Sequence, residues 1–279
     1  MGKQKRGHFG LAFLFDALIL RKYSVINLNM KISEELEKTG NWLFKHRGSF
    51  PFLIVPLLII ALRDSEYIEQ HFGHFYQNVW EVSCILISLS GLVVRSLTLG
   101  WVPEGTSGRN TKGQLADSLN QDAAYSIMRH PLYFGNFLII FGFFLFVQVW
   151  WLVVMYALLF FIFYEHIIFS EESFLERKFG ANYRKWADRT PVFFPNFKKW
   201  KASSSSFSWR MVFKREYSTL FGIIAGFVFI KFFAELFGEG HFRLRPLWFI
   251  FLAAGFIFYV TLRILRKHTN WLHIPTRKN

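Results

Sequence analysis

The chain has 279 residues, of which 52% are hydrophobic and 20% aromatic, including 36 phenylalanines. A soluble domain of this length rarely carries so much aromatic surface, so the composition argues against a soluble protein and indicates an integral membrane protein. The formal net charge is +14. Such an excess is typical of cytoplasmic loops beside anionic lipids. It does not indicate nucleic-acid binding, because no nucleic-acid motif accompanies the charge.

Apolar stretches predict an all-α, polytopic integral membrane protein with about six transmembrane helices. The longest stretch, 132–164, is too long for one crossing and is predicted to hold two helices. Its turn is expected near 148–151 (Gln-Val-Trp-Trp), since tryptophan favours the membrane interface. The predicted spans are 50–62, 79–101, two within 132–164, 217–237 and 246–262.

The polar segments divide the chain into four regions. A cytoplasmic or interfacial N-terminal extension is expected at 1–48; within it, the apolar stretch 9–20 is too short to cross a membrane and 32–45 is predicted as a surface helix. The other regions are a membrane core at 49–197, a basic serine-containing linker at 198–216, and a C-terminal transmembrane hairpin and tail at 217–279.

The distribution of lysine and arginine predicts the orientation. Nine of these residues lie in 1–48 and eleven in 165–216, whereas 63–78 holds only Arg63. Six spans with both termini in the cytoplasm place the basic segments on the cytoplasmic side. The same arrangement puts the polar residues around 130 and 171 at one cytoplasmic surface, where soluble, charged cofactors are found.

Two polar motifs bracket the apolar stretch 132–164. Arg-His-Pro at 129–131 precedes it, and Glu-Glu at 171–172 follows it. Taken singly, the first motif is an ordinary interfacial segment at the start of a span, and the second is an acidic pair near the start of a cytoplasmic helix. Because charged groups are expensive in lipid, a stretch that crosses the bilayer twice explains both, and it returns them to the same side.

A longer ordered pattern joins the two motifs. Over 91–195, the chain reads Arg-His-Pro-x-Tyr-x-Gly, then a hairpin-length apolar run, then Glu-Glu-x-x-Leu-x-x-x-Phe-Gly-x-x-Tyr-x-x-Trp. This pattern resembles the isoprenylcysteine carboxyl methyltransferase and phospholipid methyltransferase superfamily. Membrane sterol-type reductases have a similar segment, with Asn after the proline and Glu after the glycine. Leu132 and Asn136 stand at those places here, which counts against a nicotinamide-dependent reductase.

The resemblance implies S-adenosylmethionine as the methyl donor, bound in a cytoplasmic pocket. Carboxylates suit its ammonium and ribose hydroxyls, aromatic faces suit its adenine and sulfonium, and a glycine permits close backbone approach. An imidazole donates or accepts according to its tautomer. The predicted donor-binding residues are His130, Tyr133, Gly135, Glu171, Glu172 and Tyr183.

Two arginines are the predicted catalytic residues. Arg189, in Arg-Thr-Pro, matches a family arginine that holds the acceptor's anionic group, although a snorkelling interfacial arginine also fits it. Arg95 lies inside a predicted span, where a charge is a functional candidate by default. Methyl transfer requires neither metal nor nucleophile–base pair, and the chain shows no cluster of metal ligands, so no metal is expected. An ionised oxygen acceptor needs no base, which favours it over an amine.

The predicted acceptor is a membrane lipid, methylated at an anionic headgroup oxygen such as a phosphate. The two later spans, the donor-rich loop 105–112 and the basic segment 198–215 resemble a bacterial subgroup that includes lipid A phosphate methyltransferases, which implies the bacterial inner membrane. Three alternatives remain open: an isoprenylcysteine carboxyl O-methyltransferase, a phosphatidylethanolamine N-methyltransferase, and a non-catalytic lipid-binding protein of the same fold. The bilayer and its lipids are the expected partners.

Overall fold

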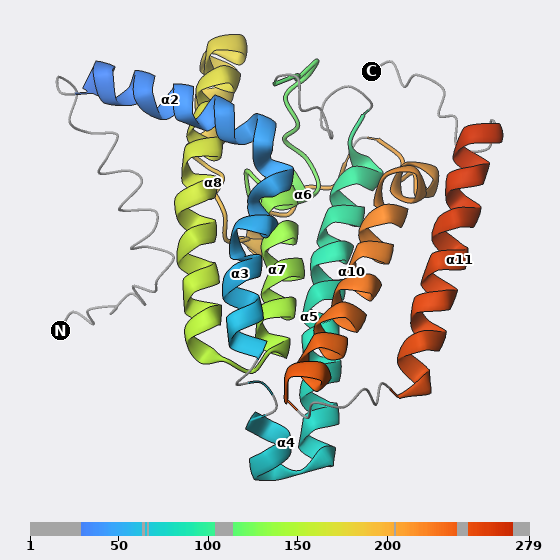
Figure 1. The fold of residues 1–279 in the computed structure, drawn as a ribbon. Helices are drawn as coiled ribbons and strands as arrows, with labels where there is room; N and C mark the ends of the chain where they lie inside the picture. Colours follow the sequence, from blue (N-terminus) through green and yellow to red (C-terminus); the bar gives the residue numbers. More distant parts are fainter. Residues whose placement is uncertain are drawn as a thin grey trace, which may run out of the picture.

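The computed structural model of the protein describes residues 29–62, 65, 67–103, 114–203, 205–238 and 245–269. Helices and turns make up these residues, with no strand among them (Figure 1). The all-α prediction is therefore confirmed. Two segments with sequence-based predictions, the apolar stretch 9–20 and the donor-rich loop 105–112, lie outside the described residues.

Four long helices and several shorter ones form one bundle (Figure 1). The long helices are α5 (His74–Trp101), α8 (Trp150–Phe179), α10 (Trp209–Gly238) and α11 (Pro246–His268). The others are α2 (Asn29–His46), the 3-10 turn η1 (Arg47–Ser49), α3 (Phe50–Ala61), α4 (Tyr67–Phe72), α6 (Ala124–Ile127), α7 (Pro131–Phe146), α9 (Ala181–Ala187) and the 3-10 turn η3 (Phe197–Lys199).

Four or five crossings are found among the described residues, whereas the sequence predicts about six. Among the described residues, α5, α8, α10 and α11 are long and apolar enough to cross, and the pair formed by α2 and α3, bent by 45°, makes a fifth if it counts as one span. Helix α7 has 16 residues, about 24 Å at 1.5 Å per residue. A hydrocarbon core is about 30 Å thick. The protein is a membrane protein, but its exact count of six spans is not confirmed.

The turn within the long apolar stretch lies where the sequence places it. Helix α7 ends at Phe146 and α8 begins at Trp150. Gln148, between them, adopts a positive φ of 67°, which is rare for a residue with a side chain. Its side chain offsets that strain through two hydrogen bonds, donating to Gln77 Oε1 (2.7 Å) and accepting from the Ile68 amide (2.8 Å).

Two helix boundaries differ from those predicted. Helix α8 continues through the acidic pair and ends at Gly180, whose positive φ of 55° breaks the helix. Helix α10 begins at Trp209 rather than at 217, so its first turns occupy part of the predicted linker. The prediction placed these boundaries at the limits of the apolar runs, whereas both helices continue into the adjoining polar residues.

An aromatic core between α7 and α8 supports the polar end of the bundle. The Phe160 ring packs 5.0 Å from Phe137 and 4.1 Å from Tyr164, centroid to centroid. Tyr164 in turn lies 4.9 Å from Tyr133. Phe193, in the segment that follows α9, closes the cluster at 6.0 Å from Phe160. The two tyrosines end this stack and begin the candidate site.

Candidate functional site

The site forms where the start of α7 meets the end of α8. His130 precedes α7, with Pro131 at the first helical position, where its missing N–H costs nothing. Backbone hydrogen bonds anchor this entry to a later segment: the amide of Arg129 donates to the Pro191 carbonyl (2.8 Å), and that of His130 to the Val192 carbonyl (3.2 Å). The segment that follows α9 therefore holds the start of α7 in place.

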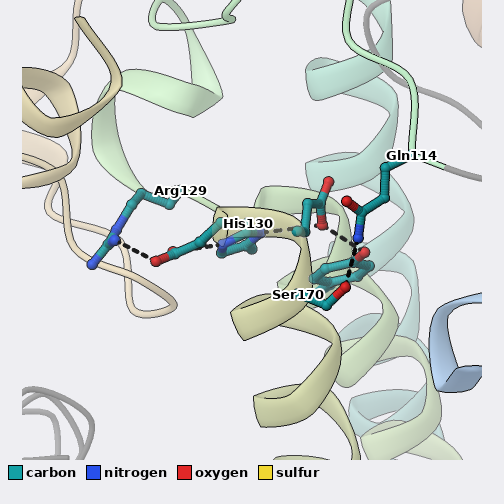
Figure 2. A network of polar contacts seen from close by, with 7 residues as sticks. Gln114, Arg129, His130 and Ser170 are labelled. Atoms are coloured by element: carbon teal, nitrogen blue, oxygen red, sulfur yellow. Dashed lines mark hydrogen bonds and ion pairs between the residues drawn. The ribbon is translucent and has the colours of Figure 1, made fainter. Parts of the chain in front are cut away.

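Glu172 binds both polar residues of the first motif. Its carboxylate accepts hydrogen bonds from Arg129 Nη1 (2.8 Å) and His130 Nε2 (3.0 Å). An ionised carboxylate can only accept, so Nε2 carries the proton of that bond. Figure 2 shows Arg129 and His130 on either side of the carboxylate that both of them bind. The structure thereby brings the two motifs into direct contact.

Glu171, the other acidic residue, faces a different way. Its Oε2 accepts a hydrogen bond from the Tyr133 hydroxyl (2.8 Å) and lies 3.7 Å from His130 Nδ1. Its side chain is 31% exposed, whereas that of Glu172 is 12% exposed. The His130 imidazole therefore lies between two carboxylates, of which Glu171 is the accessible one.

Tyr183, on α9, closes the buried side of the cluster. Its hydroxyl lies near Glu172 and Arg129 but is aligned with neither for a hydrogen bond. Burial raises the pKa of this phenol, and the negative charge of Glu172 raises it further, while Arg129 opposes both effects. Tyr183 therefore stays neutral at physiological pH.

A cavity of about 370 Å³ opens beside this cluster. Its volume falls in the range of small-molecule sites. The wall combines aliphatic and aromatic side chains with a few polar ones, contributed by helices α5, α7, α8, α9 and α10, by the segment 114–125 and by the end of α2. The lining residues include Phe44, Arg47, Arg95, Gln114, Asn120, His130, Tyr133, Glu171, Phe174, Trp186 and Glu216.

Three of the six predicted donor-binding residues, His130, Tyr133 and Glu171, line this cavity. Glu172 and Tyr183 lie behind them. Gly135 does not line the cavity: a Cβ built there would lie 2.5 Å from Arg95 Cγ, so the glycine admits a neighbouring helix. The prediction was a close approach of the donor to this glycine, whereas the close neighbour in the structure is α5.

The two predicted catalytic arginines lie apart. Arg95 lines the cavity, but Nε and Nη2 of its guanidinium bind the Glu216 carboxylate (2.9 and 2.6 Å), and Nη1 binds Asn136 Oδ1 (2.6 Å). Arg189 is exposed and lines a second, more open cleft of about 1,100 Å³. We call it the basic cleft, because its charged lining residues are four cations, Lys185, Arg189, Lys199 and Lys201, and two acids, Asp117 and Asp188. Trp186 lines both the cavity and the basic cleft.

Several residues of the cavity wall lie outside the sequence motifs. Phe44 and Arg47 come from the N-terminal extension, and Glu216 comes from the start of α10. A buried network also ties the segment before α6 to α2 and α8: Gln114 Nε2 donates to Ser170 Oγ (2.8 Å), which donates to Asn41 Oδ1 (2.8 Å) (Figure 2 labels Gln114 and Ser170). The sequence analysis assigned no role to Phe44, Arg47 or Glu216, because none of them belongs to a recognisable motif.

Comparisons with known proteins agree with this architecture. The family model described as phospholipid methyltransferase matches residues 80–182. The chain is 30% identical over 168 residues to the nickel-cobalt-cadmium resistance protein NccN of Alcaligenes xylosoxydans xylosoxydans, covering 59% of this chain and 72% of the relative. The chain is also 30% identical over 168 residues to the cobalt-zinc-cadmium resistance protein CzcN of Cupriavidus metallidurans, covering 59% of this chain and 71% of that relative.

No solved structure matches the chain. Within the described ranges, no group of three or more His, Cys, Asp or Glu side chains is placed to hold a metal ion. The matched region, 80–182, contains Arg129, His130, Glu171 and Glu172, the residues that meet in the structure. The chain therefore belongs to the phospholipid methyltransferase family, which indicates a membrane methyltransferase that acts on lipids.

Proposed function

We propose that the protein transfers a methyl group from S-adenosylmethionine to an anionic oxygen, a phosphate, in the headgroup of a membrane lipid. The observation that carries this proposal is the cavity in which Glu171, Tyr133 and His130 meet, next to the basic cleft. We further propose that this end of the bundle faces the cytoplasm of a bacterial inner membrane, because the basic segments lie there.

The cavity's residues suit this methyl donor. The exposed carboxylate of Glu171 accepts hydrogen bonds from an ammonium or from ribose hydroxyls, and His130 and Tyr133 hold that carboxylate in place. Phe174 and Trp186 offer apolar faces to an adenine ring, and Gln114 and Asn120 offer amides to its polar edge.

The bound donor supplies an electrophilic methyl group on a sulfonium that is already a good leaving group. The protein's remaining tasks are to align the acceptor oxygen with that methyl and to exclude water. Glu172 contributes indirectly, because its bonds to Arg129 and His130 fix the wall on which Glu171 stands. No general base is needed for an ionised phosphate.

The basic cleft supports an anionic acceptor. Arg189 lies there with Lys185, Lys199 and Lys201, and Trp186 separates this group from the cavity. Guanidinium and ammonium groups bind phosphate through charge-assisted hydrogen bonds. We propose that a lipid's charged head lies in this cleft while its phosphate oxygen reaches the donor past Trp186.

Calorimetric binding of S-adenosylhomocysteine to the purified full chain in detergent tests the donor site. We expect the wild type to bind and Glu171→Gln to bind at least about tenfold more weakly, since a charged hydrogen bond typically contributes that much. Glu176→Gln is the matched control, because Glu176 is on the same helix, exposed, and engaged only in a 3.7 Å surface pair with Arg184 among the described contacts. Absence of binding by folded wild type, or equal affinity in Glu171→Gln, would reject the donor assignment.

Mass spectrometry of host lipids, read for the gain of one methyl group, tests the acceptor step. We expect Arg189→Ala to keep its affinity for S-adenosylhomocysteine and to lose most lipid methylation. Lys198→Ala is the control, since Lys198 is exposed nearby on η3 but does not line the basic cleft. Unchanged methylation in Arg189→Ala would remove this arginine from acceptor binding.

A further inference from the structure

Two ion pairs join helices α5 and α10. Helix α5 supplies the cation of one pair and the anion of the other. Arg95 near the end of α5 binds Glu216 near the start of α10 (2.6 Å), and Glu81 near the start of α5 lies 3.1 Å from Lys231 of α10. Within each helix the two charges are separated by roughly four turns. Antiparallel neighbours therefore match both pairs in a single register, and Figure 1 shows α5 and α10 side by side.

The Arg95–Glu216 pair lies at the cavity. Both side chains line it, and Glu216 is only 3% exposed. The carboxylate binds the guanidinium through two parallel bonds, the geometry that fixes an arginine most firmly. A single carboxylate from α10 thus sets the orientation of a cationic side chain in the cavity wall.

From Arg95 a chain of contacts continues to the accessible carboxylate. Arg95 Nη1 donates to Asn136 Oδ1 (2.6 Å), and Asn136 Nδ2 donates to the Tyr164 hydroxyl (3.4 Å). The Tyr164 ring lies 4.9 Å from that of Tyr133, whose hydroxyl binds Glu171 (2.8 Å). Each member of this chain restricts the next, so the position of Tyr133 depends on a contact made by α10.

The Glu81–Lys231 pair has no such connection. Glu81 also accepts from Gln77 Nε2 (2.9 Å), and Lys231 lies 3.8 Å from Glu235 one turn further on. These side chains are buried and line neither the cavity nor the basic cleft. The second pair therefore attaches α10 to α5 at a place remote from the site, and it provides a natural comparison for the first.

We propose that Glu216 is a positioning residue of the methyl-donor site, acting through Arg95, Asn136 and the two tyrosines on Glu171. Helix α10 lies outside the region 80–182 that the family model matches, so the matched region holds an incomplete site. This inference rests on the proposed function, since the donor is the ligand that Glu171 would bind. It assigns Arg95 to the wall of the site, as the residue through which Glu216 acts.

The test compares two identical substitutions, Glu216→Gln and Glu81→Gln, each at a buried carboxylate paired with a cation. We expect Glu216→Gln to weaken S-adenosylhomocysteine binding by about tenfold. Glu81→Gln should lower the melting temperature and leave the affinity of the folded protein unchanged. Glu216→Asp, which keeps the charge, should recover part of the affinity. Equal affinity in Glu216→Gln and wild type, or equal losses in both Gln variants, would overturn the proposal.

A second measurement needs no ligand, so it separates this inference from the proposed function. Melting temperatures of Glu216→Gln, Tyr133→Phe and the double variant form a cycle. We expect the two effects to be non-additive, because a chain of contacts joins the two side chains. Additive effects would reject the coupling even if the protein binds the donor. Coupling in a wild type that binds no S-adenosylhomocysteine would reject the proposed donor and keep the structural link.

Discussion

Gly91 of α5 and Gly135 of α7 lie back to back. A Cβ built on Gly91 would lie 2.5 Å from the Gly135 carbonyl oxygen, and one built on Gly135 would lie 2.8 Å from the Gly91 carbonyl oxygen. Side-chain carbon atoms do not approach carbonyl oxygens so closely, so the contact exists only because neither residue has a side chain. Small residues allow membrane helices this closeness. The pair sets the distance between α5 and α7 at the level of the cavity.

We therefore predict that Gly135→Ala destabilises the protein by about 1–3 kcal/mol, the usual cost of overpacking. The new methyl group would meet backbone and the Arg95 stem rather than the flexible end of a side chain. Thermal unfolding in detergent measures the effect. Gly222→Ala is the control: it lies within α10 with nothing within 4 Å of its added Cβ, and it should be neutral or slightly stabilising. Equal melting temperatures for both variants would contradict the close contact.

Glu172→Gln should behave unlike Glu171→Gln. Glu172 is largely buried and binds both Arg129 and His130, so neutralising it leaves a buried arginine without its carboxylate. We predict a loss of about 3 kcal/mol in stability, as for other broken buried pairs. Glu171→Gln should retain nearly the wild-type melting temperature and lose donor affinity. A stable Glu172→Gln with normal affinity would show that the buried carboxylate is dispensable.

Two tyrosine variants separate bonded from unbonded hydroxyls. Tyr133→Phe removes the hydrogen bond to Glu171 and should weaken donor binding several-fold, roughly 1 kcal/mol. Tyr183→Phe removes a buried hydroxyl that has no well-aligned hydrogen-bond partner among the described residues, so stability should stay the same or rise. Because the pKa of Tyr183 is raised, its phenol is neutral below about pH 10, and Tyr183→Phe should leave the pH profile of donor binding unchanged there. A changed profile would show that this phenol ionises.

The docking of α2 against α8 should affect the donor site. Asn41 of α2 accepts from Ser170 of α8, and the end of the same segment supplies Phe44 and Arg47 to the cavity wall. We predict that Asn41→Ala lowers donor affinity as well as stability, because it leaves the fully buried Ser170 hydroxyl without its acceptor. Calorimetry and thermal unfolding together measure both effects.

The comparison for Asn41→Ala is the exposed contact between the same two helices. Arg177 binds both carboxylate oxygens of Glu37, but its side chain is 59% exposed. Surface pairs contribute about 0–1 kcal/mol, so Arg177→Ala should change neither affinity nor stability appreciably. If the two variants were equally damaging, the buried network would not be what holds α2.

Cysteine labelling tests the proposed orientation. Cys84, the chain's one cysteine, is buried, so Cys84→Ala provides an unlabelled background. In that background, we predict that Lys198→Cys reacts with a membrane-impermeant maleimide only after bacterial cells are permeabilised. Tyr76→Cys, at the opposite end of α5 from the site, should react in intact cells. The reverse pattern would place the site outside the cytoplasm.

The sequence predicted the elements of the fold better than their ends. Hydropathy located the turn at Gln148, because a change from apolar to interfacial residues marks it. It did not predict that α8 continues to Phe179 or that α7 is short, since helix length depends on hydrogen bonding and packing as well as on apolar character. Hydropathy alone therefore leaves the number of complete crossings open, with four or five found among the described residues.

The candidate site was predictable where it depended on motifs. That the two polar motifs lie at one end of the bundle followed from the predicted hairpin, whereas the direct contact of His130 with Glu172 was not predicted. Which of Glu171 and Glu172 faces the cavity was not predictable. Adjacent helical residues point about 100° apart, and only the surrounding helices decide which one is buried. The Arg95–Glu216 contact joins residues that are distant in sequence, and no local pattern signals it.

The short helix α7 starts well inside the bundle. It is about 24 Å long by its 16 residues, whereas α8 extends well beyond the start of α7 on the same side of the bundle (Figure 1). Arg129 and His130, at the start of α7, therefore lie deeper in the bundle than the last turns of α8. At such a depth the dielectric is lower than at the water surface, which strengthens their attraction to Glu172. A reactant that approaches from this end of the bundle therefore has to pass the outer turns of α8 before it meets these residues.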